Sequence, residues 1–217
     1  MIARIRQGLG VYDSAQRRAV VAKRLAQPLC PLVPERAKRS AEERRHQLRT
    51  SLEGQSATFI EVARASDIPA AVARMLRSAN LPLRVRTGDD PFLRGLPWQT
   101  EPALERTTGS AHDDDEVGLS HATAAVAETG TLVMTSGAEN PVTLNYLPET
   151  HIVVVEDKTL VGGYEGAWDK IRARFGSRTM PRTVSFISGP SRSADIGGQL
   201  VMGAHGPRRL CVIFVRG

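Results

Sequence analysis

Two polar turns in the last third of the chain carry residue types that bind anions and move protons. The first turn, Gly189 to Asp195, includes Ser191 and Arg192, and the second, Gly203 to Arg208, includes His205. An arginine fork binds carboxylate or phosphate through two parallel hydrogen bonds, and a histidine of near-neutral pKa transfers protons. We therefore predict an anion-binding site with His205 as its catalytic acid–base group. The candidate binding residues of the two turns are Gly189, Ser191, Arg192, Asp195, Gly206 and Arg208.

Both turns also have a purely structural interpretation. Arg208 and Arg209 precede an apolar strand pattern, so their side chains can simply face solvent. Asp195 can cap the segment that follows it, which is the more common role of an aspartate in that position, or it can orient Arg192 or His205. The sequence slightly favours a functional second turn and leaves both interpretations open.

A third turn contributes a carboxylate, Glu128, as a second catalytic candidate. It precedes Thr129 and Gly130 between a predicted helix and a predicted strand. A carboxylate held there can act as a base or a nucleophile, with Thr129 and Gly130 as anion-binding neighbours. Hydrogen bonding of the carboxylate to nearby backbone amides is an equally good interpretation. Ser136 and Gly137, at the end of the next strand, can offer backbone N–H groups to an anion, although a plain turn is favoured.

Several familiar kinds of site are excluded. The chain has no P-loop, no Gly-x-Gly-x-x-Gly after a predicted strand and no serine nucleophile elbow. Its two cysteines, Cys30 and Cys211, are far apart and outside any C-x-x-C pair, so we predict no metal site and no iron–sulfur cluster on this chain. We expect Cys211 to be a small buried side chain. His121 and His151 are expected to be core or strand-edge residues, and the acidic run 113–116 a solvated loop.

Charge is concentrated near the N-terminus. The net charge is +6, and residues 1–50 hold 12 Lys or Arg against 4 Asp or Glu. No aromatic residues alternate with these basic ones, so nucleic acid is an unfavoured partner and a solvated helical face is the simpler explanation. No apolar run is long enough to span a membrane and no signal-peptide pattern opens the chain, so we expect a cytoplasmic protein.

Apolar periodicity predicts the elements that must position the three turns. The predicted helices are 14–26, 40–52, 66–80, 122–127 and 164–175, and the predicted strands are 58–62, 83–86, 117–121, 131–136, 151–155, 183–187 and 210–215. A further short helix is expected through Ile196, Leu200 and Val201, between the two polar turns. Three prolines, Pro28, Pro31 and Pro34, predict a linker after the first helix.

The alternation of strands and helices predicts an α/β fold. The run 151–155 is almost wholly apolar, as expected for a strand covered on both faces. Strands 183–187 and 210–215 are expected to close the sheet. We divide the chain into a basic helical N-terminal extension, residues 1–55, and an α/β domain, residues 56–217.

Four ordered blocks lie between Gly118 and Gly217. They are Ala127-Glu-Thr-Gly-Thr-Leu132, Leu147-Pro-Glu-Thr-His-Ile-Val-Val154, Gly189-Pro-Ser-Arg-Ser-Ala-Asp-Ile196 and Gly203-Ala-His-Gly-Pro-Arg208. Together they resemble the LUD domain of the lactate utilisation protein C family (LutC, also called YkgG-like). Two departures are that relatives often carry an acidic residue where this chain has Gly197, and a basic residue in the loop 138–145, which here has none.

The resemblance implies a three-layer α/β/α sandwich like that of ribose-5-phosphate isomerases and CoA transferases. It also implies that the Glu128 turn shares a crevice with the Gly189–Asp195 and Gly203–Arg208 turns. The implied role is the oxidation of L-lactate to pyruvate beside two iron–sulfur partner proteins, which would hold the clusters that this chain lacks.

Three functional hypotheses remain at this stage. The first is a subunit of a lactate-oxidising assembly that binds a small carboxylate or phosphate-bearing ligand, with an organic cofactor left open. The alternative is a stand-alone isomerase or CoA-transferase-like enzyme for a phosphorylated or acyl-CoA substrate, with Glu128 as nucleophile by fold analogy. The third is a non-catalytic scaffold that uses the basic residues 1–50.

Overall fold

The structure is a computed structural model that describes residues 2–8, 15–26, 32–176, 179–193 and 198–217. The chain forms two compact units, Met1–Leu32 and Val33–Gly217. The first unit contains α1 (Ile2–Gly8) and α2 (Ala15–Ala26), and none of the α2 residues is buried. The second unit contains the sheets and all the sites described below.

A parallel sheet forms the centre of the second unit. Its strands, in sheet order, are β1 (Thr58–Val62), β12 (Arg209–Val215), β7 (Thr150–Glu156), β4 (Val117–His121), β2 (Arg84–Thr87) and β3 (Glu105–Thr108). Every neighbouring pair in this sheet is parallel. β7 and β12 lie inside the sheet, and nearly all their residues are buried. Parallel strands covered on both faces are apolar on both faces, which explains the continuous apolar run 151–155.

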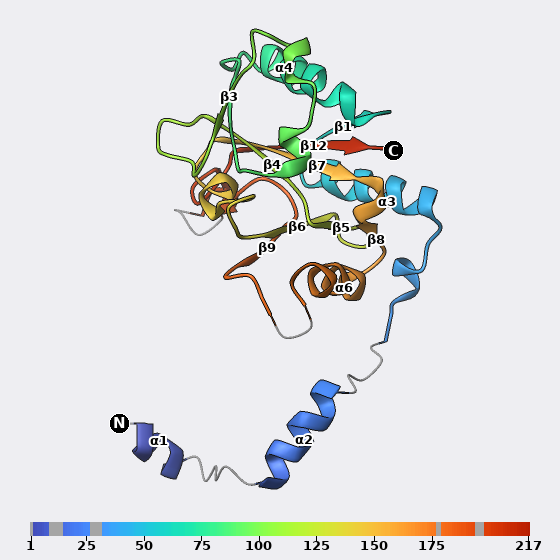
Figure 1. Cartoon of the computed structure of the whole chain (residues 1–217), viewed down its shortest axis with the longest axis vertical. Coiled ribbons are helices and arrows are strands. Elements are labelled where there is room, and N and C mark those ends of the chain that lie inside the picture. Colours follow the sequence, from blue (N-terminus) through green and yellow to red (C-terminus); the bar gives the residue numbers. More distant parts are fainter. Residues whose placement is uncertain (1, 9–14, 27–31, 177–178, 194–197) are drawn as a thin grey trace. The chain divides into compact units, whose positions relative to one another are not determined.

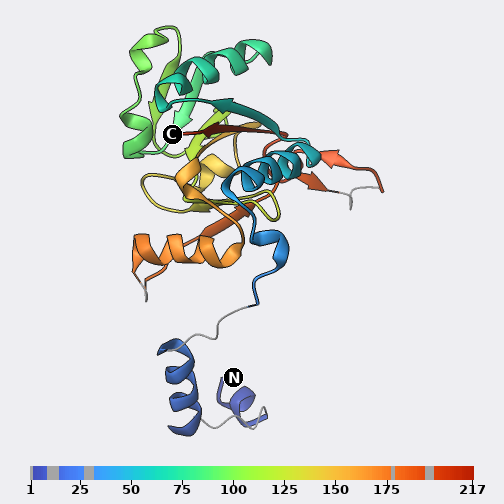
Figure 2. The same ribbon diagram turned by 90° about the vertical axis from the view of Figure 1, so that its right-hand side faces the viewer.

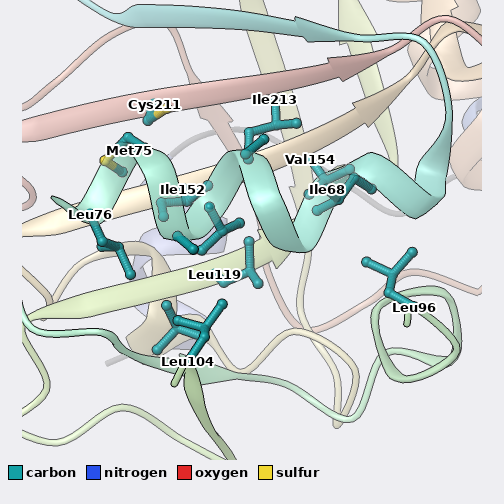
Figure 3. Packing of buried hydrophobic residues seen from close by; sticks show 14 of the residues in the cluster. Ile68, Met75, Leu76, Leu96, Leu104, Leu119, Ile152, Val154, Cys211 and Ile213 are labelled. Atoms are coloured by element: carbon teal, nitrogen blue, oxygen red, sulfur yellow. The ribbon is translucent and has the colours of Figure 1, made fainter. Parts of the chain in front are cut away.

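One face of this sheet packs against α4 (Ile68–Ser78). Side chains alternate between the two faces of a strand, so Ile152 and Val154 of β7 lie in the same cluster as Leu76 of α4. Figure 3 shows this cluster, with the helix lying across the strands. Its labelled members are Ile68, Met75, Leu76, Leu96, Leu104, Leu119, Ile152, Val154, Cys211 and Ile213.

The other face of the sheet is covered by α3 (Ala41–Gly54) and by a second sheet. Val153 and Val155 of β7 lie in a cluster with Leu48 and Leu52 of α3 and with residues of β5 and β6. The second sheet, in strand order, consists of β8 (Leu160–Val161), β5 (Ala124–Val126), β6 (Thr131–Thr135) and β9 (Val184–Ile187). Its far face packs on α6 (Tyr164–Phe175) through Ala167 and Ile171.

Helices therefore enclose the sheets. Figures 1 and 2 show α4 on one side of β12, β7 and β4, and α6 on the opposite side, beyond β5 and β6. The predicted α/β fold, a central parallel sheet flanked by helices, is confirmed. The sequence did not predict the second sheet as a layer of its own.

Short elements connect these layers. They are η1 (Glu35–Ala37), η2 (Ala65–Asp67), α5 (Pro91–Arg94), η3 (Trp98–Thr100), η4 (Val142–Asn145), η5 (Asp157–Thr159), β10 (Arg192–Ser193) and β11 (Val201–Met202).

Two predicted helices and the sheet position of one predicted strand are wrong. Residues 122–127, with their alanines, were expected to be helical, but Ala124–Val126 is strand β5, because pairing with β6 and β8 in the buried second sheet outweighs local helix propensity. Strand 183–187 was expected to close the sheet beside 210–215, but β9 pairs with β6. Instead of the helix through Val201, residues 201–202 form β11, antiparallel to β10. Residue 196 lies outside the described residues.

Helix α3 belongs to the body of the protein, whereas the sequence placed it in the extension 1–55. Its predicted capping box is present: the Ser40 hydroxyl accepts a hydrogen bond from the Glu43 amide, and the Glu43 carboxylate accepts one from the Ser40 amide. Leu48 and Leu52 are fully buried. The helix looks basic and polar in sequence because only a narrow apolar stripe faces the sheets.

Substitution of Leu48 tests the contribution of α3 to the core. We expect Leu48→Ala to lower the free energy of unfolding by about 2–5 kcal/mol, because a fully buried leucine leaves a cavity when truncated. The matched control is Leu25→Ala in α2, where the side chain is 79% exposed and the expected change is within about 0.5 kcal/mol. Chemical denaturation of the full chain measures both, and equal effects would show that α3 is not part of the core.

Candidate functional site

The two polar turns meet and line one cavity of about 280 Å³. The Ser191 amide donates to the Pro207 carbonyl at 2.8 Å, and the Gly203 amide donates to the Ser191 carbonyl at 2.9 Å. The first turn follows β9, and the second leads into β12. The cavity therefore lies at the amino-terminal ends of β7 and β12, beside the carboxyl end of β9.

Five of the predicted residues of these turns line the cavity: Gly189, Ser191, Arg192, His205 and Gly206. Arg208 is exposed and lies outside the lining. Asp195 lies outside the described residues, so its predicted role has no structural counterpart here.

Arg192 and His205 are the basic side chains of the lining that are exposed to solvent. The Arg192 guanidinium donates to the backbone carbonyl of Gln55 and, at 2.8 Å, to the Ser56 hydroxyl, so the end of α3 holds it in place. An arginine held by its surroundings loses less conformational freedom when it binds an anion. The exposed rim of the cavity is thus its positively charged end.

The inner wall of the cavity contains two buried polar side chains that the sequence did not single out as ligands. His151 is fully buried and its Nε2 lies 3.0 Å from the Ser120 hydroxyl, but no residue in the described part of the chain hydrogen-bonds to its Nδ1. Asn145 is also buried, and its Oδ1 lacks a partner among the described residues. Burial lowers the pKa of His151 to about 3, so the ring is neutral at ordinary pH.

Strand geometry and one glycine place these two side chains. His151 pairs with Gly118, and Ser120 is two residues further along β4 on the same face, so the two side chains are diagonal neighbours. A Cβ at Gly118 would lie 2.8 Å from the Leu144 carbonyl oxygen. The absence of a side chain there lets η4 approach β4 and brings Asn145 to the cavity.

A sequence signal for His151 did exist. It is a polar residue near the start of an otherwise apolar strand, and it lies in the block 147–154 that resembles the LUD family. The sequence predicts a core or strand-edge histidine whose hydrogen bonds are satisfied. It gives no sign of the unpartnered Nδ1, because the cavity exists only in the folded chain.

Glu128 does not line this cavity. Its carboxylate is 7% exposed and lies 2.6 Å from the Arg36 guanidinium, so it is held in an ion pair. Gly130, in the same turn, has φ of 63°, and a Cβ there would lie 2.6 Å from the Ser51 Cβ. The conformation and tight fit against α3 explain why a glycine occupies this position.

Hydroxyl groups connect the Glu128 turn to the cavity. The Thr129 and Thr131 hydroxyls are 2.7 Å apart, and both lie near the Tyr164 hydroxyl, at 3.1 and 3.0 Å. Thr131 also lies 2.7 Å from the Ser188 hydroxyl, and Ser188 lines the cavity. Of the three turns that the family resemblance groups in one crevice, two line it and the third contacts it through Thr131.

Ser136 and Gly137 have structural partners elsewhere. The Ser136 amide donates to the Thr183 carbonyl at 2.9 Å, and its hydroxyl accepts from the Thr183 amide at 2.8 Å. The Gly137 amide donates to the Asn140 carbonyl. These contacts extend the pairing of β6 with β9 and leave both residues outside the lining.

A second cluster of ionisable groups lies at the carboxyl edge of the parallel sheet. His121 Nδ1 lies 3.4 Å from Asp90 Oδ2, its Nε2 lies 3.2 Å from Glu156 Oε1, and its ring stacks on Phe92. Burial lowers the pKa of His121, but the two carboxylates raise it by more. Burial raises the pKa of Asp90, yet the His121 contact and the Leu93 amide bring it below its usual value, and His121 likewise lowers the pKa of Glu156.

Other candidates have simple structural roles. Asp115, in the predicted solvated loop, is buried and its Oδ2 lies 2.9 Å from Arg86 Nε. Cys211 is buried, as predicted, and burial raises its thiol pKa to about 12. Cys30 lies outside the described residues. Within the described ranges, no group of His, Cys, Asp and Glu is arranged to hold a metal ion, and no helix is long and apolar enough to cross a membrane.

Comparison with known proteins identifies relatives. A family model described as the LUD domain matches residues 45–215. Lactate utilization protein C of Shouchella clausii is 37% identical over 100 residues, which cover 46% of this chain and 44% of that protein. Lactate utilization protein C of Bacillus subtilis is 29% identical over 157 residues, which cover 71% and 65%. The first of these matches spans less than half the length of the relative.

A solved structure supports the fold. The crystal structure of a DUF162 family protein from Deinococcus radiodurans aligns with a TM-score of 0.59 and 26% identity, covering 82% of this chain and 99% of that one. The likeness supports the α/β fold of this chain.

The cluster of Asp90, His121 and Glu156 predicts a pH window for stability. The pKa of His121 is raised in the folded state. Its contribution to the free energy of unfolding is therefore full below a pH of about 6.5, the unfolded-state pKa, and is lost as pH rises through the higher folded-state pKa. The pKa values of Asp90 and Glu156 are lowered, so their contributions are lost as pH falls below about 4. We expect His121→Gln to flatten the alkaline side of the curve, measured by urea denaturation from pH 3 to 9. An unchanged slope would contradict the role of this cluster.

Proposed function

This chain belongs to the LUD domain family, and from that premise we propose that it serves a system that oxidises L-lactate to pyruvate. The names of its curated relatives support lactate utilisation. In this proposal the chain binds a small hydroxy acid or keto acid in the cavity between its two polar turns. Oxidation of L-lactate releases two electrons and two protons, and iron–sulfur partner proteins accept the electrons.

The observation that carries the proposal is the cavity itself. It combines Arg192 and His205 at an exposed rim with His151 and Asn145 inside, and it has room for a small organic acid. Arginine attracts a carboxylate and can donate two hydrogen bonds to it. A protonated His205 adds to this attraction, and a neutral one can exchange a proton with the ligand.

The proposal places the iron–sulfur clusters on partner proteins because this chain has too few cysteines to hold one. Iron–sulfur clusters are held by several thiolates, and the sequence has two cysteines in all. Cys211 is buried in β12 with a raised pKa, so its thiolate form is disfavoured. In this proposal the electrons leave the bound lactate for clusters that other chains hold.

The alternative, an isomerase or CoA-transferase-like enzyme, depends on Glu128 as a nucleophile. The Glu128 carboxylate lies 2.6 Å from Arg36 and outside the cavity lining. An attacking carboxylate needs direct access to the substrate, so these contacts favour the structural role of Glu128. The carboxylate-binding proposal uses groups that do reach the cavity.

Binding measurements test the rim. We expect Arg192→Ala to weaken L-lactate or pyruvate binding by about tenfold, because a charge-assisted hydrogen bond to the carboxylate is lost. Arg208→Ala is the matched control: it removes the same charge from the neighbouring turn but not from the lining, and a change below about threefold is expected because exposed charges are screened. Isothermal titration calorimetry gives both values. Equal losses in the two variants would place the carboxylate elsewhere.

Growth of the source organism tests the system-level role. Deletion of the gene is expected to abolish growth on L-lactate and to leave growth on pyruvate intact, because only the oxidation step is lost. A Glu128→Gln copy should restore growth on L-lactate if the ion pair with Arg36 is structural. Normal growth of the deletion strain on L-lactate would overturn the proposed function, and failure of Glu128→Gln alone, with the protein folded, would favour the alternative.

A further inference from the structure

His151 and Asn145 give the inner end of the cavity a chemistry different from that of its rim. Each is buried and each has one polar atom, Nδ1 and Oδ1 respectively, without a partner among the described residues. Buried polar atoms in native proteins are nearly always hydrogen-bonded, and an unpaired one costs about 1–3 kcal/mol. Two residues with such atoms line one cavity, which indicates a site that is completed by a ligand.

We propose that the inner end of the cavity binds the hydroxyl group of a hydroxylated anion through His151 Nδ1 and Asn145 Oδ1, while the rim holds its carboxylate or phosphate. The inference rests on the proposed function in placing the ligand in this cavity, and it adds the ligand's chemical class and the two residues that select it. L-Lactate is the smallest ligand of this class that the proposed function offers.

The inner end is unsuited to a charged group. His151 is neutral. Leu210 and Pro207, which also line the cavity, are buried and uncharged. A carboxylate placed there would lose its hydration without an opposite charge, which costs far more than burial of a hydroxyl. The permanent cation of the lining, the Arg192 guanidinium, is exposed. Charge therefore belongs at the rim and the uncharged polar group inside.

Hydrogen-bonding capacity selects a hydroxyl over a ketone. Asn145 Oδ1 only accepts, so its ligand must donate a hydrogen bond. His151 Nδ1 accepts when Nε2–H donates to Ser120, and donates when the Ser120 hydroxyl donates to Nε2. A hydroxyl has one hydrogen, so it can donate to Asn145 Oδ1 and accept from His151 Nδ1–H, the form in which the Ser120 hydroxyl donates to Nε2. A keto oxygen only accepts and leaves Asn145 Oδ1 unsatisfied.

The test compares pairs of ligands that differ in the hydroxyl group. Affinities of the full chain are measured by titration calorimetry for L-lactate against propionate, and for 2-hydroxypropyl phosphate against n-propyl phosphate. The expected preference for the hydroxylated member is at least about tenfold in one pair, because a buried hydrogen bond is lost with the other member. The pair that shows it identifies the anion as carboxylate or phosphate.

Variants test whether the preference for the hydroxylated ligand depends on His151 and Asn145. His151→Phe and Asn145→Leu are expected to reduce the preference to about one, with little effect on the ligand that lacks the hydroxyl. His112→Phe, at an exposed histidine outside the lining, is the matched control and should keep the full preference. Circular dichroism melting curves establish that each variant is folded.

A measurement on the unmodified chain does not depend on the variants folding. The ¹⁵N chemical shift of His151 Nδ1 is expected to move on addition of the hydroxylated ligand and to stay in place with its partner in the pair. A purely structural histidine would give the same shift with both ligands.

Each outcome decides the inference. A wild-type preference near one in both pairs, or no binding of any of the four ligands, overturns it, as does a preference retained in folded His151→Phe and Asn145→Leu. A preference confined to the phosphate pair supports the inference and removes L-lactate as the ligand of the proposed function. If neither pair shows a preference but the deletion strain fails to grow on L-lactate, the inference fails and the proposed function stands.

Discussion

Burial of β7 on both faces is the constraint on which the rest of the structure depends. The strand lies between β12 and β4, with α4 on one side and α3 and the second sheet on the other. A strand in that position can carry polar groups only near its ends, where they reach solvent or a cavity. His151 lies near one end and Glu156 at the other. The cavity with His151 and the cluster of Asp90, His121 and Glu156 thus lie at opposite ends of one apolar strand.

The cavity at the amino end of β7 has a gradient of polarity. Its rim is exposed and carries the Arg192 guanidinium, whereas its inner wall is buried and partly unsatisfied in hydrogen bonding. Such a gradient orients a small ligand that has one charged and one uncharged polar end, because each end is most stable in its matching environment. The proposed role in lactate oxidation would need such an orientation, because the carbon that bears the hydroxyl has to face the electron acceptor.

The turn at Glu128 belongs to one of the sequence blocks that resemble the LUD family, yet Glu128 lies outside the cavity lining. Its carboxylate pairs with Arg36, its glycine fits tightly against Ser51, and Thr131 contacts Ser188 at the cavity. These contacts connect α3, the second sheet and the turn after β9. A change in this turn would therefore affect the position of the cavity wall through packing rather than through chemistry.

The sequence by itself determined the elements with strong local signals. The capping box at Ser40, the apolar run of β7 and the amphipathic α6 were predictable, because each depends on neighbours a few residues away. So were the two polar turns, since arginine, serine and histidine between strands limit the chemistry to a few types. Tertiary structure decided the rest. Whether Ala124–Val126 is helix or strand, and whether His151 is satisfied or left with a free Nδ1, depends on partners that are distant in sequence, and local propensity carries no information about those partners.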